Sequence, residues 1–241
     1  MGSPCARGVD AVIFDWGGTL TPFHDVDLLD LWRVAAGVLA PGREEEVAAA
    51  LAAAERDWWT RAVADNRSGT TAEVVAAAAT MTGLDVDAAL HDAALTAHLE
   101  AWTPHTLADP QAVPLLTALR ERGLRTGLLS NTHWPRDWHE RWLARDGMLE
   151  LIDARVYTSD LQHLKPHPQA FSAVLEALGD IDPERTVFVG DRPLDDISGA
   201  KQMGMRAVLL PNDVVPGYDV TPDATIDRLG DLLPLIDSWS A

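Results

Sequence analysis

Short apolar runs, each ending in polar residues, recur near both ends of the chain. Six of them have the length and β-branched content of buried strands: Val9–Phe14, Leu124–Leu129, Ala154–Tyr157, Thr186–Val189, Met205–Leu210 and a weaker run at Ala224–Ile226. Helical spacing separates the later runs, at Gln111–Arg122, Trp134–Arg145, Pro168–Leu178 and Asp195–Met203. Strands that alternate with helices predict an α/β fold whose parallel sheet is covered on both faces.

The stretch from about Pro22 to Trp102 interrupts this alternation. It is rich in alanine, has no convincing strand, and shows helical spacing at Asp27–Leu39, Glu44–Ala64, Thr71–Thr82 and Val86–Ala101. Prolines stop regular structure in the flanking segments Thr19–His24 and Thr103–Pro110. We therefore expect residues 22–103 to form a separate helical bundle, inserted into a core made of residues 1–21 and 104–241.

Composition and charge limit the possible partners. The 241 residues are 47% hydrophobic and 23% charged, as in an ordinary globular protein. The formal net charge of −18 argues against nucleic acid or an anionic membrane surface as a partner. An anionic small molecule would need a metal ion or local basic residues. Only two lysines occur, Lys165 and Lys201, so the position of each is informative.

Cysteine usage and hydropathy bear on location. The single cysteine, Cys5, excludes an internal disulfide and suits a reducing compartment. No apolar stretch approaches the length of a membrane span, and the N-terminus lacks the apolar region of a signal peptide. We therefore expect a cytoplasmic protein without a membrane partner.

Polar side chains follow four of the predicted strands. Asp15 follows the first strand, Ser130-Asn131 the second, a loop ending in Lys165 the third, and Gly190-Asp191 the fourth. The carboxyl ends of parallel strands meet at one edge, where ligands of such sheets bind. A carboxylate nucleophile, a hydroxyl, an ammonium group and a second carboxylate suit phosphoryl transfer with a hard cation. Each group alone also has a structural interpretation, such as a strand end or a helix cap.

These motifs resemble those of the haloacid dehalogenase-like (HAD) superfamily of hydrolases with an aspartate nucleophile. The resemblance rests on four blocks: Phe14-Asp15-Trp16-Gly17-Gly18-Thr19-Leu20, Leu128-Leu129-Ser130-Asn131, Lys165-Pro166-His167-Pro168 with Phe171, and Gly190-Asp191 through Asp195-Asp196-Ile197, Gly199-Ala200 and Gly204-Met205. It implies a Rossmann-like core and identifies residues 22–103 as the helical cap of that family.

The resemblance also implies residue roles and a Mg²⁺ cofactor. Asp15 and Lys165 would be catalytic, with Asp15 as the nucleophile. The phosphoryl group would be bound by Ser130, Asn131, Lys165 and Gly18. The metal would be bound by Asp15, the carbonyl of Gly17, Asp191 and Asp196. Asp195 competes with Asp196 for the last role, but we expect Asp195 to cap the following helix.

One position departs from the family pattern. Family phosphatases usually carry a second aspartate two residues after the nucleophile as a general acid, and this chain has Gly17 there. Such a group is worth about 10²–10⁴ in rate. The substrate could have a good leaving group, another residue (His24, Asp25 or His167) could supply the proton, or turnover could be weak.

These observations favour a Mg²⁺-dependent phosphatase that acts on a small phosphorylated metabolite through an aspartyl phosphate. A dehalogenase-type hydrolase and a phospholigand-binding protein with weak turnover are the alternatives. In residues 22–103, Arg56, Arg61 and Arg67 could reach an anionic substrate, and Trp58 or Trp59 could line a cleft for a ring. Trp134, Trp138 and Trp142 recur at four-residue spacing, which predicts a buried helix face or a homodimer contact.

Overall fold

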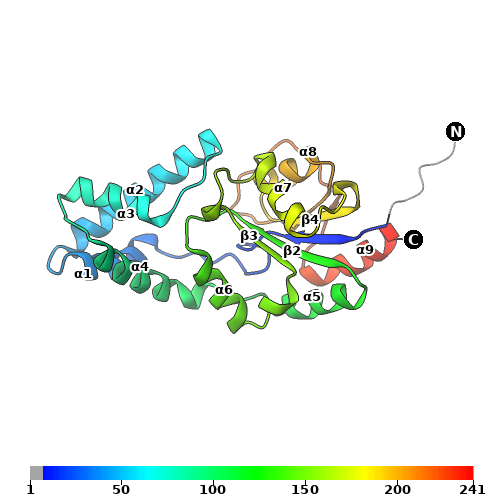
Figure 1. Cartoon of the computed structure of the whole chain (residues 1–241), viewed down its shortest axis with the longest axis horizontal. Coiled ribbons are helices and arrows are strands. Elements are labelled where there is room, and N and C mark those ends of the chain that lie inside the picture. The colour runs from blue at the N-terminus through cyan, green and yellow to red at the C-terminus, as the bar shows by residue number, and fades with distance from the viewer. Residues whose placement is uncertain (1–7, 241) are drawn as a thin grey trace.

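A six-stranded sheet lies at the centre of the computed structural model, which describes residues 8–240 (Figure 1). Its strands in chain order are β1 (Ala11–Phe14), β2 (Arg125–Ser130), β3 (Ala154–Tyr157), β4 (Thr186–Gly190), β5 (Arg206–Leu209) and β6 (Ala224–Thr225). All neighbouring pairs are parallel, in the order β3-β2-β1-β4-β5-β6. The predicted α/β fold with a parallel sheet is confirmed. Cys5, and the prediction based on it, lies outside the described residues.

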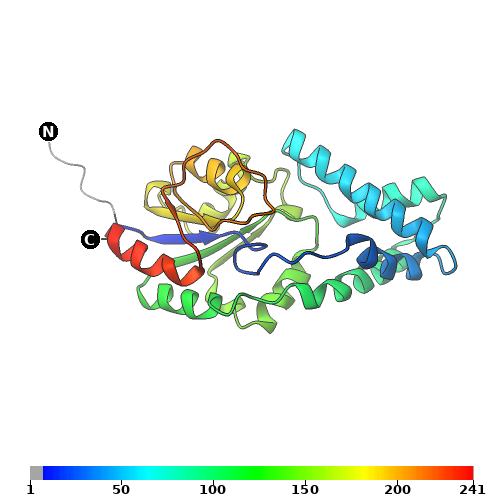
Figure 2. The same cartoon turned by 180° about the vertical axis from the view of Figure 1, so that it is seen from behind.

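Helices cover both faces of this sheet because side chains alternate along each strand. From β1, Val12 and Phe14 pack against α5 (Ala112–Glu121), α6 (Arg136–Arg145) and α9 (Leu232–Ser240). Ala11 and Ile13 face the opposite layer, made by α7 (Pro168–Ala177) and α8 (Gly199–Gln202). Figures 1 and 2 show the two layers on opposite sides of the sheet.

Four helices form a unit of their own at one end of the molecule (Figure 1). They are α1 (Leu28–Leu39), α2 (Glu44–Asp65), α3 (Thr71–Thr82) and α4 (Ala88–Trp102), and we call them the helical unit. Their apolar faces enclose a separate buried cluster that includes Trp32, Leu51 and Val74. The Asp27 and Asp87 side chains cap α1 and α4.

Hydrogen bonds tie residues 66–71, the segment between α2 and α3 with the first residue of α3, to loops that follow β2 and β3. The Ser68 amide donates to the Gln162 carbonyl at 3.0 Å, and the Thr71 amide donates to the His133 carbonyl at 2.8 Å. His163 Nδ1 lies 3.0 Å from the Asn66 carbonyl oxygen. We call residues 66–71 the tether. The helical unit is therefore held by this tether as well as by its two chain connections.

The helix expected at Asp195–Met203 differs from the prediction. A π-helical turn (Pro193–Ser198) leads into the short α8, and the residue that precedes the turn is Arg192. Asp195 therefore lies inside the turn, and the prediction that it caps a helix is wrong. The wider turn places Asp195 at a pocket while the adjacent Asp196 reaches the buried Lys165.

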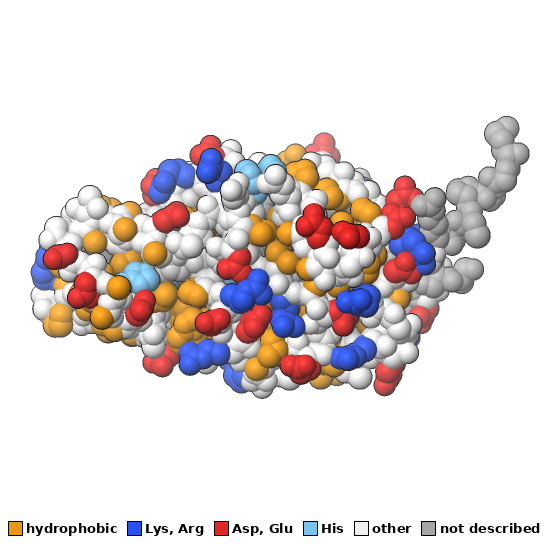
Figure 3. Space-filling model, in the orientation of Figure 1, with side chains coloured by type: hydrophobic (Ala, Val, Ile, Leu, Met, Phe, Trp, Pro, Cys, Tyr) orange, Lys and Arg blue, Asp and Glu red, His pale blue; other side chains and the backbone are white. Residues whose placement is uncertain are grey.

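The remaining helical elements are single turns. They are 3₁₀ turns at Thr103–His105, Leu149–Leu151, Thr158–Asp160, Pro183–Arg185 and Leu229–Asp231. Within residues 8–240, no helix combines the length and apolar character needed to cross a bilayer. Basic and acidic side chains are interspersed over the face in Figure 3. Ion pairs such as Arg136–Asp160 and Arg155–Glu140 join side chains of opposite charge. That the chain binds no nucleic acid stays a prediction.

Candidate active site

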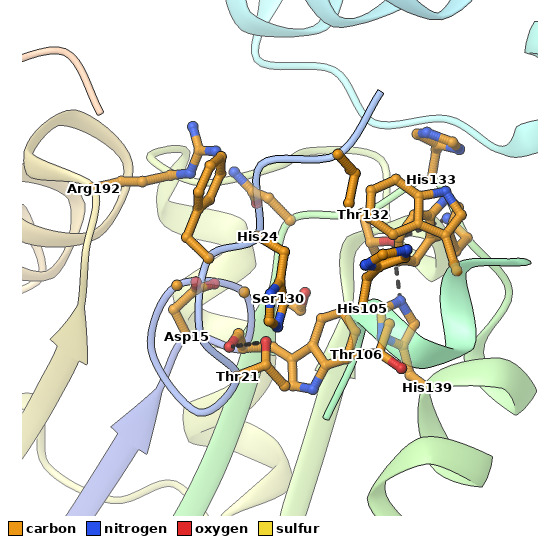
Figure 4. A pocket seen from close by; sticks show the side chains of 18 of the residues that line it. Asp15, Thr21, His24, His105, Thr106, Ser130, Thr132, His133, His139 and Arg192 are labelled. Atoms are coloured by element: carbon orange, nitrogen blue, oxygen red, sulfur yellow. Dashed lines mark hydrogen bonds between the residues drawn. The ribbon is translucent and has the colours of Figure 1, made fainter. Parts of the chain in front are cut away.

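The carboxyl ends of three adjacent strands deliver the first site residues. Asp15 directly follows β1, Ser130 ends β2, and Asp191 directly follows β4. Because β1 pairs with both β2 and β4, with Phe14 opposite Leu128 and Val189, these residues lie side by side. The strand order changes direction between the neighbouring strands β1 and β4. Ligands of open α/β sheets bind at such a switch point. Figure 4 shows Asp15 and Ser130 at this edge.

Lys165 connects the nucleophile candidate to the fourth motif. Its Nζ donates to Asp15 Oδ1 at 2.6 Å and to Asp196 Oδ1 at 2.7 Å, and its side chain is fully buried. The Asn131 side chain fixes the loop that carries it, since Asn131 Oδ1 accepts from the Lys165 amide and Nδ2 donates to the Lys165 carbonyl. Asn131 therefore positions Lys165. Its direct contact with a phosphoryl group stays a prediction.

The charges at this edge do not balance. Oxygens of Asp15, Asp191 and Asp196 lie within 4.8 Å of one another, and all three residues are buried. Burial raises the pKa of Asp15 although Lys165 opposes it. Burial, reinforced by the charges of Asp15 and Asp196, raises the pKa of Asp191 to about 7. Burial lowers the pKa of Lys165, but the two carboxylates outweigh it and the net shift is upward. Lys165 therefore stays charged.

The donor set fits a hard divalent cation. Asp191 Oδ2 accepts from Asn212 Nδ2 at 3.1 Å, whereas the buried Oδ1 has no hydrogen-bond partner among the described residues. An unpartnered buried carboxylate oxygen is costly unless an ion binds it. Asp196 differs, because its Oδ1 accepts from Lys165 and its Oδ2 from the Arg192 amide. Asp15 and Asp191 thus offer the freer oxygens, and a metal role for Asp196 stays a prediction.

Two glycines leave the space that the carboxylates occupy. A Cβ at Gly18 would lie 2.3 Å from Asp191 Oδ2, and one at Gly190 would lie 2.3 Å from Asp196 Oδ2. Gly18 also has a φ of 83°, which favours glycine. Gly17 is different, because no atom lies within 4 Å of an added Cβ. Glycine at position 17 is therefore not required by packing.

A pocket of about 530 Å³ lies between this edge and the helical unit. Asp15, Gly17, Gly18, Ser130 and Asn131 line it from the sheet side. Lys165, Asp191 and Asp196 are not among its lining residues. The pocket therefore gives access to Asp15, Ser130 and Asn131, whereas Lys165, which offsets the charge of Asp15, and the other two aspartates of the cluster lie behind the lining.

The residues that could replace the missing acid differ in whether they line the pocket. His24 and Asp25 line the pocket, and His24 can be followed in Figure 4. His167 does not, since its ring stacks on His163 and its Nδ1 accepts from the Gln169 amide at the start of α7. The arginine candidates of the helical unit, Arg56, Arg61 and Arg67, are also absent from the described lining of the pocket.

Two features of the site were missed from the sequence. Glu55 of α2 lies in the pocket wall, where its Oε1 is 2.9 Å from His133 Nε2 and its Oε2 accepts from Trp32 Nε1. Asn212, beyond β5, contacts Asp191. His133 follows Ser130-Asn131 by two residues, so its proximity to the motif was the one available signal. Glu55 has no such local signal.

Comparisons with known proteins agree with this geometry. A family model described as haloacid dehalogenase-like hydrolase matches residues 9–204. A glyceraldehyde 3-phosphate phosphatase of Methanopyrus kandleri is 31% identical over 159 residues, 64% of this chain and 67% of that protein. Pyrophosphatase PpaX of Bacillus mycoides is 30% identical over 122 residues, 49% of this chain and 54% of that protein. The chain therefore spans about two thirds of one relative and about half of the other.

Among solved structures, the 2-haloacid dehalogenase from Pseudomonas syringae pv. Tomato DC3000 has a TM-score of 0.73 to this chain at 24% identity. The superposition covers 96% of this chain and 99% of that chain. At this identity the likeness shows the fold alone.

Replacing Lys165 should destabilise the protein strongly. Lys165→Met leaves Asp15 and Asp196 buried without their cation, and breaking such a pair costs about 3–5 kcal/mol. Lys201→Met is the matched control, because Lys201 pairs with Asp223 on the surface, where a pair contributes about 1 kcal/mol or less. Urea unfolding of the two variants measures the difference. Equal losses of stability would contradict the buried pairing.

Replacing Asp191 should stabilise the metal-free protein, in contrast to the loss of stability expected on replacing Lys165. A folded-state pKa of about 7, against 3.8 normally, means that the fold disfavours the Asp191 carboxylate increasingly as pH rises from 4 to 7. Each pKa unit is about 1.4 kcal/mol. In chelator near pH 8, Asp191→Asn should raise the free energy of unfolding by roughly 2–4 kcal/mol.

The stability gained by Asp191→Asn should vanish near pH 4. Mg²⁺ should stabilise the wild type but not Asp191→Asn. Asp213→Asn, a change at an exposed neighbour of Asn212, should shift stability by only about 0.5 kcal/mol or less. A metal-free Asp191→Asn variant less stable than the wild type near pH 8 would refute the charge imbalance.

Proposed function

The chain belongs to the haloacid dehalogenase-like hydrolase family, and we propose that it is a Mg²⁺-dependent phosphatase of a small phosphorylated metabolite. The observation that carries the proposal is the buried, unpartnered Oδ1 of Asp191 beside Asp15. A divalent cation bound there would satisfy that oxygen and offset the excess negative charge of the three aspartates. The phosphatase names of the two curated relatives support the same reaction class.

The chain's own residues suggest the order of events. Asp15 would attack phosphorus, forming an oxygen–phosphorus bond while the bond to the leaving oxygen breaks and its electron pair stays on that oxygen. Burial raises the pKa of Asp15, and Lys165 opposes this rise and so favours the nucleophilic carboxylate form. Ser130 and Asn131 would donate to the phosphoryl oxygens. Water would then hydrolyse the aspartyl phosphate, releasing phosphate and restoring Asp15.

Asp15, Asp191, the Gly17 carbonyl and Asp196 are our proposed ligand set for Mg²⁺. When bound, the ion would screen the repulsion between the phosphoryl oxygens and these carboxylates. We also propose that residues 22–103 act as the cap of the core formed by residues 1–21 and 104–241. A cytoplasmic location and a homodimer stay predictions.

A dehalogenase-type reaction is the weaker candidate. Displacement of halide requires no metal ion, so it would leave the charge excess around Asp191 without a chemical use. The structural likeness to a 2-haloacid dehalogenase concerns the fold alone. A phospholigand-binding protein with weak turnover remains an alternative, which a measurement of turnover separates from the phosphatase.

Asp15→Asn should abolish hydrolysis of an activated aryl phosphate. The amide keeps the shape of the carboxylate and lacks its nucleophilicity, so release of the phenol should fall to the uncatalysed background. The wild type should release it with Mg²⁺ and lose this activity in chelator. Absence of wild-type turnover above the variant, with both proteins folded, would exclude the phosphatase.

Gly17→Asp should restore general acid catalysis. Position 17 has room for a side chain, and a positioned acid contributes about 10²–10⁴ in rate when the leaving oxygen needs a proton. We expect kcat/KM for an alkyl phosphate to rise about tenfold or more, with little change for an aryl phosphate. Gly17→Asn is the control, since it adds the same bulk without the acid. Equal alkyl phosphate turnover in all three folded proteins would contradict the missing-acid interpretation.

A further inference from the structure

A continuous row of aromatic rings forms one side of the pocket. Its members, which we call the aromatic wall, are His24, Trp59, Trp102, His105, His133 and Trp134, and all line the pocket. Successive ring centroids are 5.8 Å apart for Trp59–His133, 6.1 Å for His133–Trp134, 4.9 Å for Trp134–Trp102, 6.2 Å for Trp102–His105 and 6.1 Å for His105–His24. Figure 4 shows the three histidines of the wall from different parts of the chain.

The pocket also collects apolar side chains that are unusually exposed. Phe23, Leu28 and Val63 are exposed by 50%, 37% and 48%, and all three line it. Exposed apolar groups gathered around a cavity indicate a binding surface for an apolar group. They come from the loop after β1 and from α1 and α2, so all three belong to residues 22–103.

Cations are scarce in the pocket. Among its described lining residues, Arg192 is the only lysine or arginine, whereas Asp25, Glu55 and Asp195 also line it. Arg192 directly follows Asp191, so it lies at the end where the phosphoryl group would bind. Nothing equivalent is available at the wall for a second phosphate or carboxylate of a substrate.

Hydrogen bonds within the protein occupy both ring nitrogens of His133 in the aromatic wall. The Thr71 hydroxyl donates to the His133 carbonyl, so His133 Nδ1 must donate to that hydroxyl oxygen, 2.9 Å away. Burial raises the pKa of Glu55, but His133, Trp32 and His98 together outweigh it and the net shift is downward. Glu55 is therefore a carboxylate 2.9 Å from His133 Nε2, and with Nδ1 in contact with Thr71 neither ring nitrogen of His133 is free to bind an anionic group of a ligand.

We propose that the aromatic wall binds a planar, uncharged ring on the leaving-group side of the substrate, which makes the substrate an aryl or heteroaryl phosphate monoester. The inference rests on the proposed phosphatase function. Rings stack or meet edge to face at the centroid distances found along the wall. The volume of about 530 Å³ is within the usual range for a small-molecule site.

Gly17 supports this substrate class independently. A phenol ionises with a pKa of about 10, far below the value of about 15.7 for water. As Asp15 forms its bond to phosphorus, the bond to the aryl oxygen breaks and the electron pair leaves with it as a phenolate. The phenolate takes its proton from solvent afterwards. A ring-bearing substrate therefore needs no general acid at position 17.

Kinetics with 2-naphthyl phosphate and phenyl phosphate test the ring site, because the two leaving groups have similar acidity and differ in ring area. In the wild type we expect kcat/KM to be about tenfold higher for the naphthyl ester. Trp59→Ala should remove this preference, and Trp59→Phe should retain part of it. Trp138→Ala is the control, since Trp138 lies on α6 outside the lining and its loss should leave the preference unchanged.

Binding of 2-naphthol, followed by its fluorescence anisotropy, separates this inference from the proposed function. We expect it to bind the wild type and Asp15→Asn equally and Trp59→Ala about tenfold more weakly. Hydrolysis of both esters with equal kcat/KM, and no naphthol binding, would overturn the ring site and leave the phosphatase standing. Naphthol binding that depends on Trp59, without hydrolysis of either ester, would support the ring site and overturn the phosphatase.

Discussion

The fold of the site depends on one buried ammonium group between two carboxylates. Lys165 joins Asp15 at the end of β1 to Asp196 in the π-helical turn after β4, two residues far apart in the chain. Oxygens of three buried aspartates lie within 4.8 Å of one another, and Lys165 offsets part of their mutual repulsion. Asn131 holds the backbone of Lys165 on both sides, so β2 also contributes to the position of the charge. Residues that follow β1, β2 and β4 are thus all bonded to Lys165.

Much of this arrangement follows from the sequence because parallel strands deliver their carboxyl ends to one edge. Asp15, Ser130 and Asp191 each directly follow or end a strand, so sheet order alone brings them together. The helical unit was predictable for a related reason, since alanine-rich periodicity and capping residues such as Asp27 are local signals. Helix α9 was not anticipated from its apolar spacing.

Other features depend on tertiary contacts that leave no local pattern. Glu55 and His133 are 78 positions apart and meet only because α2 packs over the loop after β2. The π-helical turn places Asp196 against Lys165 and Asp195 at the pocket, and a period of 3.6 residues cannot anticipate that. Trp134 was grouped with Trp138 and Trp142 on one helix, but α6 begins at Arg136 and Trp134 faces the pocket instead.

The tether changes what the helical unit can do during turnover. A lid joined by two chain connections alone could swing freely, but residues 66–71 bond to the loops after β2 and β3 on another side. Bonds at these positions resist hinge opening, so the chamber is largely preformed and little ordering entropy is lost when a rigid guest enters. A preformed pocket selects substrates by size, because a molecule longer than the cavity is excluded and the cavity does not widen to accommodate it.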